Sequence, residues 1–369
     1  MAEQTPDVGS RLKAQGSGQW LAAERQRILV IAPSNIGDAI LASDVIATLA
    51  RCYPDAHVTL LIGARAKTLF VEDPRIQTII DTNAEESLIS RLKLALALWR
   101  HQPQVVVDLR HTLYPLLLKP LQCWRFMRLP PKRLRHMRDR HLWKLRRQVP
   151  EIARALAHEP AQPIPGAVVR HARADGLWYS PKDAAHIETL RKRWQLDAAR
   201  PLVVIAPGAR SHIKRWTVEG FARLADRLMV ERNAQVVFSG EPDEKPTIEE
   251  ILSLMSQRAL SAVGLITVRQ LGVLMQRASL VITNDSASLH LASAQDVPTV
   301  AIFGPTDAGK YGPTATQART IRRRLFCAPC EQALCRFNHE CMRFVTAAEV
   351  FEAAAELLGR RAEGGGRSL

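Results

Sequence analysis

The sequence of 369 residues contains no long hydrophobic run. Its longest apolar stretches, such as Leu113 to Leu118 and Leu202 to Pro207, are far shorter than the roughly 18 residues that a membrane-spanning helix needs. The segment from Met1 to Trp20 is polar and of mixed charge, without the apolar centre of a secretory signal. Both absences predict a cytoplasmic protein.

Two signatures of nucleotide-binding proteins are also missing. No GxGxxG follows the first expected strand, so the fingerprint of a dinucleotide cofactor is absent. The complete loop GxxxxGK(S/T) is absent too, because Tyr311 follows the stretch from Gly304 to Lys310 where the motif requires Ser or Thr. These absences argue against an oxidoreductase and against a nucleoside triphosphatase.

Positive charge, by contrast, is abundant. The chain carries 51 Lys and Arg against 36 Asp and Glu, a formal net charge of +15. Eleven of these cations lie between Lys119 and Arg147, where Asp139 is the single acid. Trp124, Phe126 and Trp143 are interleaved with them. This mixture suits an anionic lipid surface or phosphate groups, but a solvated helical face has the same composition, so both interpretations stay open.

Short apolar runs alternate with helical patterns along most of the chain. We expect strands at 28–32, 57–62, 76–80 and 104–109, and again at 202–206, 235–239, 280–283 and 299–303. Such alternation is typical of parallel sheets with crossover helices. The predicted fold class is therefore α/β, with two facing Rossmann-like, doubly wound domains.

The length of the chain and a proline-rich break at 158–165 predict where the domains divide. We expect a flexible N-terminal extension at 1–26 and a first Rossmann-like domain at 27–165. A second Rossmann-like domain is expected at 166–347, followed by a C-terminal helix and a flexible tail at 348–369.

Polar and glycine residues gather after the expected strands, at the edge where open parallel sheets bind their ligands. In the first half these are Asn35, Gly37, Asp38, Asp108, Arg110 and His111. In the second half they are Ser211, Lys214, Glu244 and the run from Thr283 to His290. This distribution predicts a binding site between the two sheet edges.

Three of these positions have specific chemical interpretations. The run from Thr283 to His290 opens a helix with small side chains, which leaves backbone N–H groups available to a phosphate, or simply capped by Asp285 or Ser286. Lys214 can neutralise a departing diphosphate, although most lysines are only solvated. Asp38 can accept a proton from an attacking hydroxyl group, or cap a helix.

The order of these motifs from about Arg27 to Leu358 resembles glycosyltransferase family 9, the ADP-heptose:lipopolysaccharide heptosyltransferases. The resemblance rests on Ser34 to Asp38, Ser211 to Trp216, and Thr283 to His290 together with Gly304 to Thr306. It implies a GT-B fold, with the acceptor bound mainly by the first domain and the ADP-sugar by the second.

The resemblance also implies roles for single residues. Asp38 matches the general base, and Lys214 matches the residue that contacts the diphosphate and the sugar. The implied donor-binding residues are Ser211, Lys214, Glu244 at the ribose, Ile266 at the adenine, Asp285 at the sugar, Ser286, Ala287 and Ser288 at the phosphates, and His290. The implied acceptor-binding residues are Asn35, Arg110 and His111. Ala287 stands where the family commonly has glycine.

Four cysteines form a separate cluster of closely spaced thiols, with His339 among them. They are Cys327, Cys330, Cys335 and Cys341. Thiolates at such spacings can hold zinc or an iron–sulfur centre, and disulfides are disfavoured in a reducing cytoplasm. Any metal there is expected to be structural, and the site residues include no catalytic metal ligand.

The sequence thus predicts an inverting transferase of heptose from ADP-heptose to a lipopolysaccharide core acceptor of the lipid A/Kdo type, with no required cofactor. The expected partners are the ADP-sugar, a phosphorylated lipid-linked saccharide and the anionic inner face of the cytoplasmic membrane; no nucleic acid is expected. Two alternatives remain at this point. One is transfer of another nucleotide-activated sugar, and the other is a non-catalytic basic protein that binds nucleic acid or membrane.

Overall fold

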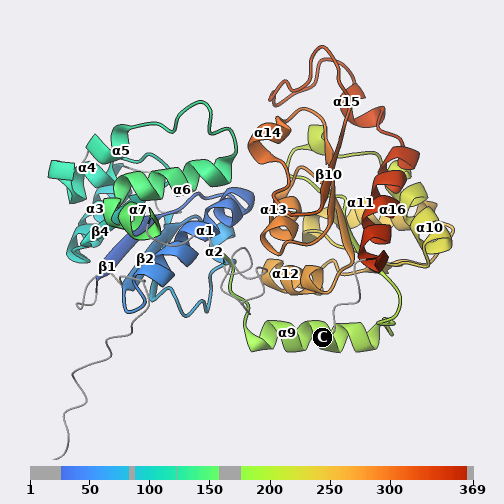
Figure 1. The fold of residues 1–369 in the computed structure, drawn as a ribbon, viewed down its shortest axis with the longest axis horizontal. Helices are drawn as coiled ribbons and strands as arrows, with labels where there is room; N and C mark the ends of the chain where they lie inside the picture. The colour runs from blue at the N-terminus through green and yellow to red at the C-terminus, as the bar shows by residue number, and fades with distance from the viewer. Residues whose placement is uncertain (1–25, 83–87, 123, 158–175, 364–369) are drawn as a thin grey trace, which may run out of the picture.

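The computed structural model describes residues 26–82, 88–122, 124–157 and 176–363. They form two α/β halves that lie side by side (Figure 1). Apart from Gln26, the expected N-terminal extension lies outside the described residues, as do the break at 158–165 and the tail after Glu363. The domain boundary at 165/166 therefore stays a prediction.

Four parallel strands form the sheet of the first half, in the order β3-β2-β1-β4. They are β1 (Arg27–Ile31), β2 (His57–Ile62), β3 (Thr78–Asp81) and β4 (Val105–Asp108). The helices are α1 (Ile36–Cys52), α2 (Ala64–Lys67), α3 (Leu88–Arg100), α4 (Tyr114–Leu118), η2 (Pro120–Gln122), α5 (Trp124–Met127), α6 (Met137–Gln148) and α7 (Pro150–Ala157). The order of the strands reverses between β1 and β4, which places a ligand-binding crevice at their carboxyl ends.

Six parallel strands form the sheet of the second half, in the order β10-β9-β8-β5-β6-β7. They are β5 (Leu202–Ala206), β6 (Gln235–Phe238), β7 (Leu260–Ser261), β8 (Leu280–Asn284), β9 (Thr299–Phe303) and β10 (Ala318–Arg322). The strand order reverses here between β5 and β8. Both halves are therefore doubly wound, and each has one reversal point.

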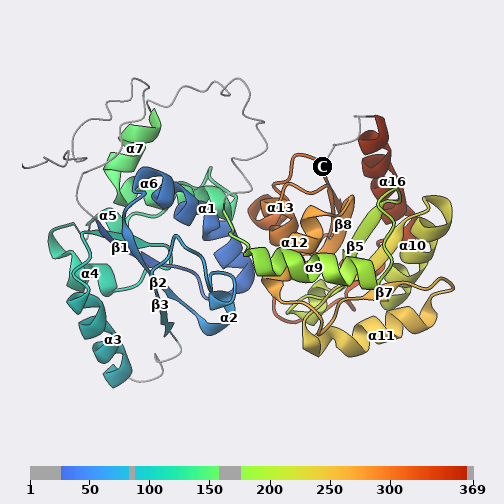
Figure 2. The same ribbon diagram turned by 90° about the horizontal axis from the view of Figure 1, so that it is seen from below.

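Helices also surround the sheet of the second half (Figure 2). They are α9 (Pro181–Arg193), η3 (His212–Lys214), α10 (Val218–Glu231), η4 (Pro242–Glu244), α11 (Lys245–Leu254), α12 (Val268–Gln276), α13 (Ala287–Ala294), α14 (Ala308–Tyr311), α15 (Glu340–Arg343) and α16 (Ala347–Glu363). Among the described residues, no helix has both the length and the apolar character to cross a membrane.

Alternate residues of the central strand β1 pack into different layers. Ile28 and Val30 belong to the core that includes the buried side of α1. Leu29 and Ile31 pack on the opposite face of the sheet, against buried leucines of α3. A strand that is apolar on both faces is the pattern of a parallel sheet covered by helices on each side.

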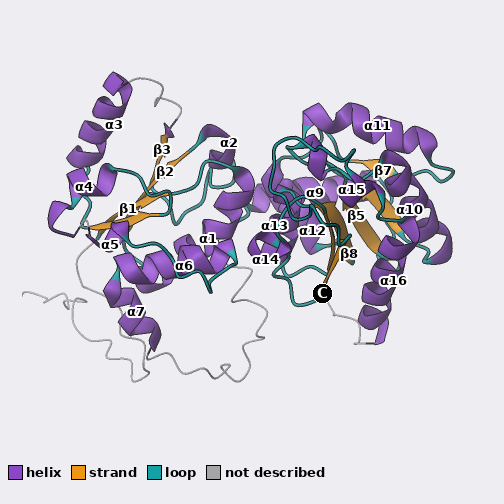
Figure 3. Ribbon diagram, turned by 90° about the horizontal axis from the view of Figure 1, so that it is seen from above, coloured by secondary structure: helices purple, strands orange, loops and turns teal. Residues whose placement is uncertain are grey.

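The central strand of the second sheet is covered in the same way. Val203 and Ile205 of β5 pack with α10 and α16, whereas Leu202 and Val204 pack with α12. The view from above shows helices on both faces of this sheet (Figure 3). Each half is thus a sheet between two helical layers, as the alternation in the sequence predicts.

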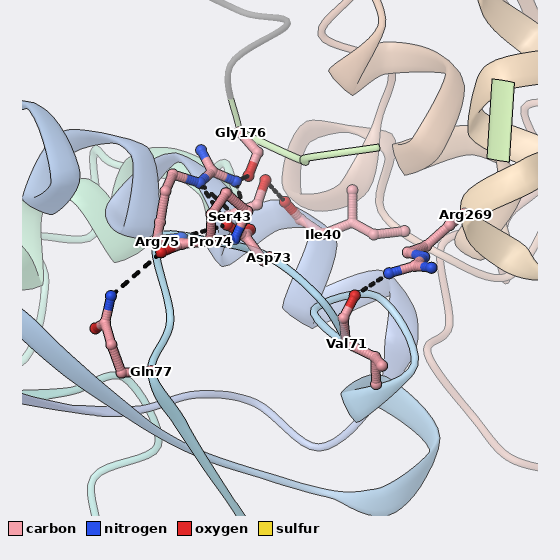
Figure 4. Close-up of polar contacts among 9 residues, drawn as sticks. All are labelled: Ile40, Ser43, Val71, Asp73, Pro74, Arg75, Gln77, Gly176 and Arg269. Atoms are coloured by element: carbon pink, nitrogen blue, oxygen red, sulfur yellow. Dashed lines mark hydrogen bonds and ion pairs between the residues drawn. The ribbon is translucent and has the colours of Figure 1, made fainter. Parts of the chain in front are cut away.

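The two halves touch where α1 and α13 begin. A Cβ atom placed on Gly37 would lie 3.0 Å from Cδ2 of His290 and 3.7 Å from Cα of Ala287. At a second contact, a guanidinium nitrogen of Arg269 in α12 donates to the carbonyl oxygen of Val71 in the first half (Figure 4). The described arrangement is therefore closed, with the carboxyl ends of β1 and β8 facing each other.

Candidate functional site

Asp38 lies in the first turn of α1, which follows β1 after the short loop 32–35. The N-cap of this helix is Asn35, whose side chain makes no capping hydrogen bond but donates to Oδ2 of Asp38 at 3.4 Å. Asp38 itself is therefore not the N-cap, and the capping interpretation of this residue is wrong. Its carboxylate is left to face the opposite half of the molecule.

The electrostatic surroundings of Asp38 come from both halves. Burial raises the pKa of its carboxyl group, the amide of Asn35 lowers it, Lys214 lowers it and Asp285 raises it. Asn35 also accepts a hydrogen bond of 2.7 Å from the guanidinium of Arg210 across the boundary. A half-buried carboxylate with a raised pKa is better suited to accept a proton near neutral pH than an ordinary aspartate.

Lys214 and Asp285 form an ion pair in the second half. The Nζ atom of Lys214 lies 2.6 Å from Oδ2 of Asp285. The Asp285 side chain is almost fully buried, while about a third of the Lys214 side chain remains exposed. The ammonium group is thus held at the edge of the sheet by a buried carboxylate, with part of its surface open to a ligand.

Asn284 fixes the loop that carries Lys214. Its fully buried side chain accepts a hydrogen bond from the backbone N–H of Trp216 at 3.2 Å and donates to the carbonyl oxygen of Pro207 at 2.6 Å. The ring nitrogen of Trp216 donates to the carbonyl oxygen of Val345 at 2.9 Å. Asn284 therefore positions the Lys214 loop; it lies beside Asp285 in the sequence, yet no site role was predicted for it.

The start of α13 is the candidate phosphate site. Its N-cap Ser286 makes no side-chain capping hydrogen bond, and the Ser286 hydroxyl lies 3.1 Å from that of Thr283 instead. The backbone N–H groups of Ala287 and Ser288 fall in the first turn, where a helix provides no acceptor of its own. An anion bound there would be stabilised by these donors and by the helix dipole.

His290 lies one turn further along α13, against the beginning of α1. It is almost fully buried, and burial lowers the pKa of its imidazole to about 4. Its Nδ1 atom is buried and has no hydrogen-bond partner among the described residues. His290 is thus a neutral side chain at the contact between the halves, close to Gly37, and the structure brings it next to the candidate site.

Two glycines make room for Glu244. A Cβ atom on Gly208 would overlap the Glu244 carboxylate, and one on Gly240 would come within 2.8 Å of its Oε2 atom. The same Oε2 accepts a hydrogen bond from the N–H of Glu241 at 2.9 Å, while burial raises the pKa of the Glu244 carboxyl group. The carboxylate is therefore fixed between the ends of β5 and β6, where it can accept hydrogen bonds from ligand hydroxyl groups.

The remaining donor-side positions occupy the same edge of the second sheet. Ser211 is the N-terminal cap residue of η3, half-buried and in extended conformation. Ile266 is half-buried between β7 and α12 and packs on the core of α12. The sequence therefore predicted a set of residues that do lie at strand ends, but nothing in the structure alone assigns a ligand to each of them.

Arg110 and His111 follow the end of β4. The buried carboxylate of Asp108 shapes this turn, since it accepts hydrogen bonds from the N–H groups of Arg110 (2.8 Å) and Thr112 (2.6 Å). His111 has a positive φ of 59° and an exposed side chain, and burial of part of the ring and the nearby Lys144 lower its pKa. The turn places the cation of Arg110, and a His111 ring whose lowered pKa favours its neutral form, at the end of β4.

The sequence analysis assigned no site role to a cationic side chain that is buried behind this turn. Lys144 of α6 is almost fully buried and donates to the carbonyl oxygen of Leu109 at 2.6 Å; burial lowers its pKa to about 8. His141 is also buried, neither of its ring nitrogens has a partner among the described residues, and burial lowers its pKa to about 3. In the sequence, both residues look like part of a solvated basic helix.

Tyr311 is a second residue that sequence reasoning missed. It lies at the end of α14, and the pKa of its phenol is raised by burial and then by the charges of Asp38, Glu331 and Asp285. Asp38 belongs to the first half and Asp285 and Glu331 to the second, so carboxylates of both halves act on this phenol. Its motif, from Gly304 to Thr306, was recognised, but Tyr311 lies five residues beyond that motif.

The cysteine segment packs beside the same sheet edge. A Cβ atom on Gly304 would lie 2.9 Å from Sγ of Cys341, and burial followed by the other three thiols raises the Cys341 pKa to about 11. The backbone N–H groups of Phe337 and His339 both donate to Sγ of Cys335 at 3.3 Å. All four cysteines are free, and within the described part of the chain no three His, Cys, Asp or Glu side chains are arranged to hold a metal.

The two facing doubly wound halves, with polar residues at the sheet edges between them, have the GT-B fold. The same fold is seen in the E. coli ADP-heptose lipopolysaccharide heptosyltransferase II, with a TM-score of 0.67 and 23% identity over 91% of this chain and 100% of that chain. A family 9 glycosyltransferase from Veillonella parvula has a TM-score of 0.73 and 20% identity over 92% and 99% of the two chains.

Sequence comparison places the chain more narrowly. Residues 172–340 match glycosyltransferase family 9 (heptosyltransferase). The lipooligosaccharide heptosyltransferase 2 of Campylobacter jejuni is 25% identical over 90% of this chain and 98% of its own length. The lipopolysaccharide heptosyltransferase 2 of Salmonella typhimurium is 26% identical over 80% of this chain and 88% of its own length. Residues 172–340 are therefore a glycosyltransferase family 9 domain, and the chain is similar to lipopolysaccharide and lipooligosaccharide heptosyltransferases over most of its length.

Proposed function

We propose that this enzyme transfers a heptose from ADP-heptose to a lipopolysaccharide core acceptor of the lipid A/Kdo type, with inversion at the anomeric carbon. The observation that carries the proposal is the position of Asp38. This carboxylate belongs to the first half, yet its pKa responds to Lys214 and Asp285 of the second half. The names of the family 9 relatives support heptose as the sugar and the lipopolysaccharide core as the acceptor.

In this mechanism Asp38 is the general base. It takes the proton of the acceptor hydroxyl group while that oxygen attacks the anomeric carbon on the face opposite to ADP. Its raised pKa brings its basicity closer to that of a base working near neutral pH. Closure of the two halves aligns the hydroxyl group with the sugar and removes water from the site.

The leaving ADP is stabilised by the second half. We assign the diphosphate to the Lys214 ammonium group, which is partly exposed, and to the N–H groups at the start of α13, which would stabilise the charge that it acquires. Because these groups supply both a full cation and aligned dipoles, we propose that transfer needs no metal ion. Activity should therefore survive treatment with a chelator. Loss of activity that only a divalent ion restores would contradict this part of the mechanism.

The second half is the proposed donor-binding domain and the first half the acceptor-binding domain, divided near 165/166. Glu244 would hold the ribose hydroxyl groups, Ile266 would line the adenine pocket, and Asp285 would hold the sugar. The proposed phosphate contacts are Ser211, Ser286, Ala287 and Ser288, with His290 supporting the start of α13. An E. coli heptosyltransferase of the same fold has been solved with ADP, in line with an ADP donor (TM-score 0.60).

The acceptor side is proposed to bind negative charge. Arg110 and His111 lie at the exposed end of β4, and the buried Lys144 lies behind them. Asn35 completes the proposed acceptor edge next to Asp38. These groups suit a phosphorylated, lipid-linked saccharide, which would be met at the inner face of the cytoplasmic membrane.

The decisive experiment is a donor screen that measures nucleotide release. ADP-heptose, ADP-glucose, a UDP-sugar and a GDP-sugar are each offered with and without a de-acylated lipopolysaccharide core acceptor. We expect rapid ADP release only from ADP-heptose and only when the acceptor is present. Preference for another nucleotide-sugar would identify a different transferase, and absence of release from every donor would favour a non-catalytic binding protein.

A further inference from the structure

Large apolar side chains are exposed mainly in one region of the first half. Ten of the eighteen exposed large apolar side chains among the described residues lie between 92 and 129. The remaining eight are spread over the rest of the described chain, mostly in the second half. Ordinary soluble surfaces expose such residues singly, and a contiguous group marks an interaction surface.

Helix α3 carries one side of this region. Its buried leucines, Leu94 and Leu98, pack on the sheet. Leu92, Leu96 and Trp99 are exposed and lie at helical spacings of four and three residues, which places them on one face, away from the buried leucines. The helix is therefore apolar on two opposite sides, although only one of them packs against the protein.

The exposed residues continue across the neighbouring short helices. Helix α4 packs on α3 and on η2, and η2 packs on α5. Their exposed apolar side chains are Leu113, Leu116, Leu117, Leu121, Trp124 and Met127. Leu121 is 92% exposed, and Leu113 and Met127 are each 74% exposed. In two views these helices lie together, on the side of the first half remote from the second half (Figures 2 and 3).

The charge of this region has one sign. Between Leu88 and Arg138 the chain contains a single acid, Asp108, which is buried and accepts backbone hydrogen bonds. Exposed cations of the region include Lys93, Arg100, Arg128 and Lys132. A second copy of this chain would present the same excess of cations and would be repelled, whereas an anionic surface would be attracted.

Trp124 links the apolar and cationic parts of the region. The guanidinium groups of Arg125 and Arg147 lie over its ring, 5.4 and 5.1 Å from the ring centre. Half of the Trp124 side chain remains exposed. An aromatic ring flanked by arginines suits the boundary between lipid headgroups and acyl chains, because the ring enters the apolar layer while the cations stay at the phosphates.

We propose that the exposed face of α3, α4, η2 and α5 is a docking surface for an anionic lipid bilayer. We call it the α3–α5 surface. Its leucines, Met127 and the two tryptophans enter the headgroup boundary, and the surrounding Lys and Arg contact lipid phosphates. The surface adjoins the turn after β4, so docking would bring the acceptor-binding edge close to membrane-embedded lipid-linked saccharides.

The α3–α5 surface covers only part of the basic segment that the sequence indicated. Arg138 pairs with Asp44 of α1, and Arg135 pairs with Asp307 of the second half. Phe126 is buried under the surface, so the expectation that it enters a lipid interface is wrong. Arg135 is thus held across the boundary between the halves and Arg138 is held by α1, so the cations that we assign to lipid, such as Arg128 and Lys132, lie earlier in the chain.

The test is flotation of the full-length protein with vesicles of phosphatidylcholine alone or mixed equally with phosphatidylglycerol. One variant removes exposed apolar groups, Leu117→Ser, Leu121→Ser and Met127→Ser together. A second reverses charge, Arg128→Glu with Lys132→Glu. The matched controls are Val230→Ser with Leu254→Ser, and Arg223→Glu with Arg258→Glu, all exposed positions of the second half. Thermal unfolding of each variant confirms that it is folded.

The wild-type protein should bind the anionic vesicles more strongly than the neutral ones, and less strongly at high salt. Each α3–α5 variant should lose about tenfold or more in partitioning, since each basic or apolar group contributes separately. The two controls should bind like the wild type. Because binding is measured without sugar substrates, its result is independent of the proposed transfer reaction.

Equal binding by the wild type and both α3–α5 variants would overturn the proposal. So would equal loss in the second-half controls, which would indicate attraction by net charge alone. Sedimentation velocity without lipid tests self-association. If the wild type self-associates and the apolar variant does not, the surface binds a second copy of the chain, and the lipid proposal is wrong. De-acylated acceptor should be used by the α3–α5 variants at the wild-type rate, because it needs no membrane.

Discussion

The guanidinium group of Arg135, in the loop before α6, lies 2.8 Å from the carboxylate of Asp307, just before α14. This ion pair joins the first half of the molecule to the second. The adjacent His136 reinforces it, since its Nε2 atom lies 3.1 Å from the carbonyl oxygen of Gly312. These contacts belong to the closed arrangement, in which Asp38 faces Lys214.

Breaking the Arg135–Asp307 pair should shift the enzyme toward the open arrangement. Because exposed ion pairs contribute only about 0.2–1 kcal/mol, Arg135→Gln or Asp307→Asn should lower kcat by roughly two- to fivefold. The double variant should be no slower than the slower single variant, since both remove the same contact. The exposed Arg133→Gln is the control. Additive losses, or a loss in Arg133→Gln of the same size, would show that closure does not depend on this pair.

Replacing Asp38 by Asn should separate chemistry from binding. We expect kcat to fall by about a hundredfold or more, the usual effect of losing a general base, with ADP-sugar affinity unchanged. In the wild type, the acidic limb of kcat should lie above the ordinary aspartate pKa of 3.8, because burial raises the pKa of Asp38. This limb should disappear in Asp38→Asn. Near-normal turnover of the variant would remove Asp38 from the reaction.

Replacing Lys214 by Ala should weaken ADP-sugar binding and slow transfer together. The diphosphate is charged before the reaction, and its charge grows as ADP leaves, so the ammonium group acts in both states. Lys214→Arg should restore part of both properties, because it can keep the ion pair with Asp285. Lys245→Ala, an exposed lysine of α11, serves as the control. Isothermal titration and initial rates that are both unchanged in Lys214→Ala would place it outside the site.

The buried His141 should make the protein less stable in mild acid. Burial lowers its pKa from 6.5 to about 3, so between these values the unfolded chain binds a proton that the folded chain does not. The contribution of His141 to the free energy of unfolding is therefore fully present above pH 6.5. It is lost as the pH decreases below 6.5, by up to about 1.4 kcal/mol per pH unit for one group. His141→Phe should flatten the dependence of the urea midpoint on pH between 5 and 7, whereas the exposed His101→Gln should not. Parallel curves for wild type and His141→Phe would contradict this assignment.

The strands that the sequence predicted best are those buried on both faces. The expected ranges 57–62, 202–206 and 299–303 coincide with β2, β5 and β9, because a continuous apolar run has clear ends. Strand β7 was missed because two half-buried residues carry no periodicity. Strand β10 was missed because it is an edge strand, and its sequence, ARTIR, includes a half-buried Arg319 and an exposed Arg322.

The site residues were predictable where a polar or charged residue comes soon after the end of a strand. Asp38, Lys214, Glu244 and Asp285 all lie near strand ends, and topology alone brings such positions to one edge. Lys144 was not predictable, because α6 is basic along its length and its sequence does not show which cation is buried. The position of a side chain on a polar helix depends on packing, which periodicity cannot resolve when every face carries charge.

The contact at Gly37 sets a limit on how closely the two halves approach. Only a hydrogen atom separates its backbone from the imidazole of His290, since a carbon atom there would already be 3.0 Å from the ring. The backbone at the start of α1 and the ring of His290 in α13 are in contact, so the two halves cannot approach each other more closely at this point. The methyl group of Gly37→Ala would therefore push the two halves apart here by a few tenths of an ångström, without removing any charged group of the site.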